Sequence, residues 1–69
     1  MNRDPVNSSA ILSVGYDAHG MILEIEITGG AIYQYFDVPE GVFREFMGAE
    51  SLGRYYNANI KNSYRYTKL

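Results

Sequence analysis

The chain of 69 residues has no cysteine, no tryptophan and one histidine. Without cysteine it can form neither disulfides nor thiolate metal sites, and it has no cysteine nucleophile. His19 alone cannot supply the three or four ligands of a transition-metal site, so we expect no metal and no cofactor. No segment has the pattern of a strained nucleophile turn or an oxyanion hole. We therefore expect no catalytic residues and a protein that is not an enzyme.

Long apolar runs are also missing. No basic segment followed by an apolar one opens the chain, and the aliphatic runs are only a few residues long. We therefore expect no membrane association and a cytoplasmic, microbial protein. Apolar residues make up 46% of the chain and charged residues 20%, which is typical of a folded domain. At this length the core only just outweighs the chain entropy, so few apolar side chains can be spared for other work.

Charge is unevenly distributed along the chain. Residues 1–53 contain all eight acidic residues and two arginines, a net charge of −6, whereas residues 54–69 contain four basic residues and no acid. A solvated basic tail explains this pattern, and so does a surface that binds an anion. The basic residues are Arg54, Lys61, Arg65 and Lys68.

Alternation of apolar and polar residues predicts three strands. It is visible in residues 11–17, in 21–28 and in 31–36, with glycine-containing turns between them. These segments predict a three-stranded antiparallel meander. Residues 1–7 contain a proline and no periodicity, so we expect a disordered N-terminal end and a single domain over residues 8–69.

The pattern after Asp37 is helical. Pro39 suits a first helical position, and apolar residues from Val42 to Met47 share one face before Gly48. Ser51 can cap a second short helix, and the last residues alternate like a short final strand. The sequence therefore predicts an α+β fold: a three-stranded meander, two short helices and a short C-terminal strand.

Two Tyr-x-Tyr pairs stand out, at residues 33–35 and 64–66. The loop of the second hairpin decides where Tyr33 and Tyr35 point, because a slip of one residue exchanges the two faces of a strand. A two-residue Gly29-Gly30 loop would place both tyrosines on the outward, acidic face. A three-residue loop or a bulge would turn them into the core and leave Gln34 in water. Turn preferences favour the first arrangement, but the burial of Gln34 counts against it.

Several segments in order resemble a known family. They are "SSAILSVGYD", "YQYFDVP", "AESLGRYYNANIK" and the terminal tyrosine cluster. Together, over residues 8–66, they resemble the KTSC domain, which is named for its occurrence at the C-terminus of some lysyl-tRNA synthetases and is also found as a free-standing small bacterial protein. The resemblance implies no catalytic residues. RNA binding has been suggested for the family because of the synthetase association.

We consider two functions for the chain. The first is a non-enzymatic module that binds RNA or another nucleic acid weakly, with basic side chains on phosphates and exposed tyrosines stacked on bases. The second is a protein-interaction or homo-oligomerisation module, since tyrosine and arginine are also enriched at interface hot spots. For each tyrosine, packing in the core is the structural alternative. The candidate binding residues are Tyr33, Tyr35, Arg54, Tyr55, Lys61, Tyr64, Arg65, Tyr66 and Lys68.

Overall fold

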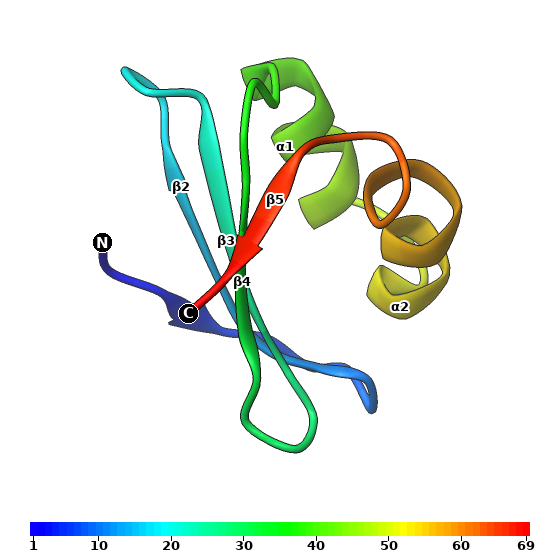
Figure 1. Cartoon of the computed structure of the whole chain (residues 1–69). Helices are drawn as coiled ribbons and strands as arrows, with labels where there is room; N and C mark the ends of the chain where they lie inside the picture. The colour runs from blue at the N-terminus through cyan, green and yellow to red at the C-terminus, as the bar shows by residue number, and fades with distance from the viewer.

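The three predicted strands form the centre of a wider antiparallel sheet. The computed structural model describes residues 1–69, and its sheet has five strands in the order β1-β2-β3-β4-β5 (Figure 1). The prediction of a three-stranded meander is therefore corrected to five strands. The elements along the chain are β1 (Asp4–Pro5), β2 (Ile11–Asp17), β3 (Ile22–Ile27), β4 (Ile32–Tyr35), α1 (Glu40–Met47), α2 (Leu52–Tyr55), the π-helical turn η1 (Tyr56–Ile60) and β5 (Tyr66–Lys68).

The two additional strands lie at the edges of the sheet. The predicted C-terminal strand is present as β5, which pairs with β4. The N-terminal end, which we expected to be disordered, contains β1, and β1 pairs with β2. Pro5 can occupy this position because an edge strand does not need every backbone N–H for pairing. The Arg3 side chain also holds this segment, because its Nε donates to Ser13 Oγ at 2.9 Å and its guanidinium pairs with Glu24.

The β3–β4 hairpin places the tyrosines of β4 on the core face. Ile25 is opposite Tyr33 and Leu23 is opposite Tyr35. The Ile27 N–H donates to the Ala31 carbonyl at 2.9 Å, so Thr28, Gly29 and Gly30 form a three-residue loop. Both glycines have positive φ, 104° and 97°, which a residue with a side chain rarely adopts. The three-residue alternative is thus the one in the structure, and the two-residue loop that turn preferences favoured is not.

A β-bulge in β2 changes which of its side chains point into the core. Ile11 pairs with Ile27 but Ser13 pairs with Glu26, so Leu12 is the extra residue. Without the bulge, Ile11 and Ser13 would point to the same face. With it, Ile11 enters the core. The core residues are Ile11, Val14, Leu23, Ile25, Tyr35, Val38, Phe46, Tyr56 and Ile60.

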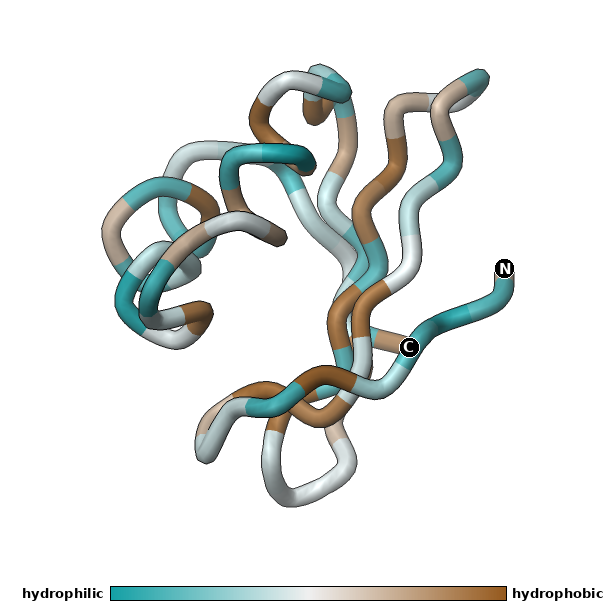
Figure 2. The backbone as a smooth tube through the Cα atoms, turned by 180° about the vertical axis from the view of Figure 1, so that it is seen from behind, coloured by the Kyte–Doolittle hydropathy of each residue, from teal (hydrophilic) through white to brown (hydrophobic).

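The helices cover one face of the sheet only. In Figure 1 they lie to the right of the strands and the chain ends lie to the left, and Figure 2 shows the same arrangement from behind. α1 buries Phe46, and the Tyr16 hydroxyl connects β2 to the segment before α1 by donating to the Val38 carbonyl at 2.6 Å. Ser51 caps α2 by accepting from the Arg54 N–H at 3.3 Å, as its position predicts. None of the helices is long and apolar enough to cross a membrane.

Candidate binding site

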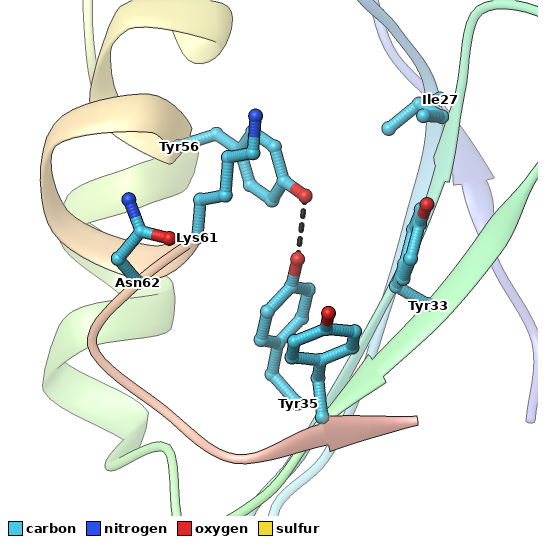
Figure 3. Close-up of a pocket in the computed structure, with 7 residues that line it drawn as sticks. Ile27, Tyr33, Tyr35, Tyr56, Lys61 and Asn62 are labelled. Atoms are coloured by element: carbon cyan, nitrogen blue, oxygen red, sulfur yellow. Dashed lines mark hydrogen bonds between the residues drawn. The ribbon is translucent and has the colours of Figure 1, made fainter. Parts of the chain in front are cut away.

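A pocket of about 180 Å³ lies between the sheet and the end of the second helical segment. Figure 3 shows Ile27 and Tyr33 from the sheet on one side of it, and Tyr56, Lys61 and Asn62 from the helical side on the other. Tyr35 and Tyr66 complete the lining, so that β3, β4, β5 and η1 all contribute. Five of the seven lining residues are apolar or aromatic, and none is acidic.

Four tyrosine rings form one connected cluster at this pocket. The ring of Tyr66 lies 5.7 Å from that of Tyr33 in an edge-on arrangement and 5.6 Å from that of Tyr35. Tyr35 meets Tyr56 edge-on at 5.9 Å. Tyr35 is only 1% exposed and Tyr66 is 56% exposed, so the cluster runs from the core to the surface. Edge-on pairs are favourable contacts and leave ring faces available.

The hydroxyl groups of Tyr35 and Tyr56 bond to each other inside the pocket (Figure 3). Burial raises the pKa of Tyr35 far above its ordinary value of 10, and the hydrogen bond with Tyr56 raises it further. The Tyr35 phenol is therefore protonated throughout the physiological pH range. Two phenols carry two O–H protons, and the bond between them uses one. One O–H donor of the pair therefore has no acceptor within the pair.

A π-helical turn brings Lys61 to the pocket. The Lys61 N–H donates to the Tyr56 carbonyl at 2.9 Å, a bond that spans five residues. In an α-helix, side chains five residues apart point about 140° away from each other around the axis. A π-helical turn contains one residue more, so side chains five residues apart point toward the same side. Tyr56 and Lys61 consequently line one pocket. Such π turns occur frequently at functional sites.

Glu24 and Glu26, the acidic side chains of the central strand β3, lie on the opposite face. Glu24 is opposite Gln34 in the ladder and accepts from its amide at 2.8 Å, while it also pairs with Arg3. Glu26 accepts from the Ser13 hydroxyl at 2.9 Å. Burial alone would raise the pKa of Glu24, but the hydrogen bonds from Gln34 and Arg3 and the charge of Arg3 lower it overall. The Glu24 and Glu26 carboxylates are thus hydrogen-bonded on the face away from the pocket.

The structure brings some of the predicted binding residues together. Tyr33, Tyr35, Lys61 and Tyr66 all line the pocket. Lys68 is opposite Tyr33 in the β4–β5 ladder and therefore projects from the same face of the sheet, beside the pocket.

The other predicted residues have structural contacts elsewhere. Tyr55 stacks on Phe46 at 5.6 Å and donates to Glu45 at 2.9 Å. Arg65 pairs with Asp37 at 3.1 Å and lies over the Phe36 ring.

Tyr64 and Arg54 are also outside the pocket. Tyr64 is half-buried and packs against the core. Arg54 is exposed on α2 and does not line the pocket.

The candidate residues predicted from the sequence did not include Ile27 and Tyr56, which line the pocket together with Asn62. The helical spacing of Tyr56 with Leu52 and Ile60 indicates a buried residue, and Tyr56 is indeed 8% exposed. Its hydroxyl nevertheless reaches Tyr35, which the helical pattern cannot reveal because the contact depends on the register of a distant strand.

The described features define a small α+β domain with a helix-covered antiparallel sheet and a tyrosine-lined pocket. A family model described as the KTSC domain matches residues 7–64, and the chain belongs to the KTSC domain family. The crystal structure of a KTSC domain protein from Yersinia pestis superposes with a TM-score of 0.93 at 43% identity, covering 99% of this chain and 96% of that one.

Sequence relatives include both short proteins and long ones. The chain is 48% identical over 61 residues to a protein of Tsukamurella paurometabola, covering 88% of this chain and 91% of that protein. It is 41% identical over 70 residues to an uncharacterised protein of Stutzerimonas stutzeri, covering 100% and 99%. It is also 33% identical over 61 residues to a lysine–tRNA ligase of Nostoc punctiforme, covering 88% of this chain but 11% of the ligase.

Proposed function

We propose that this protein is a non-enzymatic module that binds single-stranded RNA weakly through the pocket face. The main support for the proposal is that aromatic and basic side chains lie on one face of the sheet and two glutamates lie on the other. Tyr33, Tyr66, Lys61 and Lys68 lie at or beside the pocket, while Glu24 and Glu26 lie on the other face. An RNA strand on the pocket face would meet aromatic rings and ammonium groups and would avoid the carboxylates.

The relatives support the same proposal. Three lysine–tRNA ligases, enzymes named for a tRNA, contain a segment similar to this chain over about a tenth of their length. A module that binds RNA weakly would be useful as an appendage to such an enzyme, because linking two binding modules raises the overall affinity.

The expected affinity is modest. Base–aromatic stacking contributes roughly 1–3 kcal/mol per base, and the exposed rings here can accept one or two bases. Two lysine–phosphate contacts predict that log K falls with log salt concentration at a slope of about −1.4 on single strands. Lys61 and Lys68 are the two contacts, since Arg65 is occupied by Asp37.

The proposal is tested by fluorescence anisotropy of a labelled single-stranded RNA of mixed sequence, with duplex RNA as the comparison. Lys61→Glu should weaken binding strongly and reduce the salt slope by about 0.7, corresponding to one phosphate contact. Arg54→Glu is the matched control, because it changes the net charge equally at an exposed position that does not line the pocket. Equal effects of the two variants, or no binding at low salt, would contradict the proposal.

A protein-interaction role is the alternative that the same experiment detects. Tyr66 is 56% exposed and β5 is an edge strand, and both features also suit a protein partner or a second copy of the chain. An aromatic protein interface would be nearly indifferent to salt. Absence of RNA binding together with concentration-dependent sedimentation would favour this alternative.

A further inference from the structure

We infer that the pocket holds the base of a single nucleotide, with the nucleotide's phosphate on Lys61 and the free O–H of the Tyr35–Tyr56 pair donated to an acceptor on the base. This inference rests on the proposed function and specifies its ligand: one unpaired nucleotide per domain. The pocket would therefore also take a free nucleoside monophosphate.

The size of the pocket limits the ligand to one ring system. Pockets for drug-sized ligands have volumes of about 300–1,000 Å³, and this one has about 180 Å³. A second base could not enter with the first. The rest of an RNA strand would lie outside, where Lys68 projects from β5 beside Tyr33.

The lining of the pocket favours a flat, partly apolar ligand. Ile27 and Tyr33 form one side, and Tyr56 faces them from η1 (Figure 3). Tyr33 is only partly buried, and its neighbour Tyr66 meets it edge-on, so that the Tyr33 ring is not covered by a parallel stack within the protein. A base has a π-face that can stack on such a ring, whereas a sugar or an aliphatic side chain has none.

The hydroxyl pair supplies one hydrogen-bond donor to the ligand. Tyr35 and Tyr56 bond only to each other, and the second proton of the pair has no acceptor from the protein. Both residues line the pocket, and we assign the donor to Tyr56 because this residue is the more exposed of the two, at 8% against 1% for Tyr35. Every base carries ring nitrogens or carbonyl oxygens that accept such a bond. The donor therefore favours a base over a purely aliphatic ring without selecting one base strictly.

The charge at the rim favours a ligand that carries an anion. Lys61 is the only charged residue in the lining, and Asn62 next to it offers an amide donor and an acceptor. No carboxylate lines the pocket, so the lysine has no competing partner there. A phosphate attached to the base through a sugar would place its oxygens outside the apolar walls, where Lys61 and Asn62 lie.

The test is an amide NMR titration of the full chain with UMP and with AMP, each at millimolar concentration. Ribose 5-phosphate, which lacks the base, is the matched ligand control. We expect UMP or AMP to shift the amides of Tyr33, Lys61 and Tyr66, and ribose 5-phosphate to shift only those around Lys61, more weakly. Equal shifts from ribose 5-phosphate and from the nucleotides would overturn the inference, because they would show a phosphate contact without base binding.

Two variants separate the base contact from the phosphate contact. Lys61→Gln should weaken nucleotide binding by roughly tenfold, the effect of one charge-assisted hydrogen bond, while Arg54→Gln should leave it unchanged. The double variant Tyr35→Phe/Tyr56→Phe removes the donor and should weaken UMP and AMP binding without changing ribose 5-phosphate binding. If the double variant does not fold, Tyr35→Phe alone should retain nucleotide binding, since Tyr56 keeps its proton. Nucleotide binding that is unaffected in the folded double variant, or lost in Tyr35→Phe, would overturn the assigned donor.

Failure of this inference is distinguishable from failure of the proposed function. Salt-dependent RNA binding without any shift from the nucleotides would overturn the single-nucleotide pocket and leave RNA binding standing. If neither RNA nor nucleotides bind, both the inference and the proposed function are wrong.

Discussion

The hydroxyl pair of Tyr35 and Tyr56 makes a quantitative prediction about stability. Tyr56→Phe removes the only partner of the hydroxyl of Tyr35, a residue that is 1% exposed. A buried polar group left without a partner costs about 1–3 kcal/mol, so we expect a loss near 2 kcal/mol. Tyr35→Phe leaves the hydroxyl of Tyr56, a residue that is more exposed, at 8%, so that water from the pocket can replace the partner more readily. This variant should lose only about 1 kcal/mol.

The double variant should be more stable than the two single effects imply. Replacing both hydroxyls by hydrogen leaves two apolar rings of the same shape and no unpaired group, which is nearly neutral. We therefore expect a coupling energy of about 3 kcal/mol, the sum of the two single losses, between the two positions, which are in direct contact. Urea unfolding followed by far-UV circular dichroism measures it. Single effects that add up to the double effect within roughly 0.5 kcal/mol would contradict this expectation, because they would show that the two hydroxyls do not depend on each other.

Three further predictions concern the sheet face opposite the pocket. Gly15→Ala should destabilise the protein by roughly 1–3 kcal/mol in urea unfolding and detach β1, because the new Cβ would lie 2.5 Å from the Asn2 carbonyl oxygen. Gly41→Ala is the control: a Cβ at this position of α1 meets no neighbouring atom, so this variant should be more stable by about 0.5–1 kcal/mol. Arg3→Ala should cost about 2 kcal/mol by leaving the buried Glu24 carboxylate without its cation, and a loss below about 0.5 kcal/mol would contradict this role. The pKa of Glu24 is lower in the folded state than its ordinary value of 4.5, so the ionised carboxylate stabilises the fold above pH 4.5. This stabilisation is lost as the pH falls below 4.5 through the folded-state pKa. The free energy of unfolding should therefore drop less on acidification in Glu24→Gln than in the wild type.

Local patterns predicted much of the fold. The alternation in residues 21–28 identifies β3, and the apolar face from Val42 to Met47 identifies α1, because each pattern reports the face that an element buries. Ser51 was correctly identified as a helix cap since capping depends on a bond only three residues away.

Features that depend on distant residues were not predictable in this way. The side on which Tyr33 lies follows from a three-residue loop, and the two glycines of that loop are equally compatible with a shorter one. β1 carries no periodicity of its own, and it is held by the Arg3 contacts with Ser13 and Glu24. The sequence shows neither partner as near, because the contacts span ten and twenty-one residues.

The candidate site was only partly predictable for the same reason. Composition identified the basic C-terminal segment, and Lys61 and Tyr66 from that segment do line the pocket. Arg65 belongs to the same segment, yet it pairs with Asp37, twenty-eight residues earlier. The π turn that carries Lys61 to the pocket has no local signature that propensities would reveal.

The most direct test of RNA binding by the pocket face is an amide NMR titration of the labelled protein with bulk tRNA at low and then moderate salt. If RNA binds on the pocket face, we expect shifts at Tyr33, Lys61 and Tyr66 that recover as salt rises, with no shift at Glu24 on the opposite face. Shifts confined to residues outside the pocket face, or none at a large excess of tRNA, would contradict it.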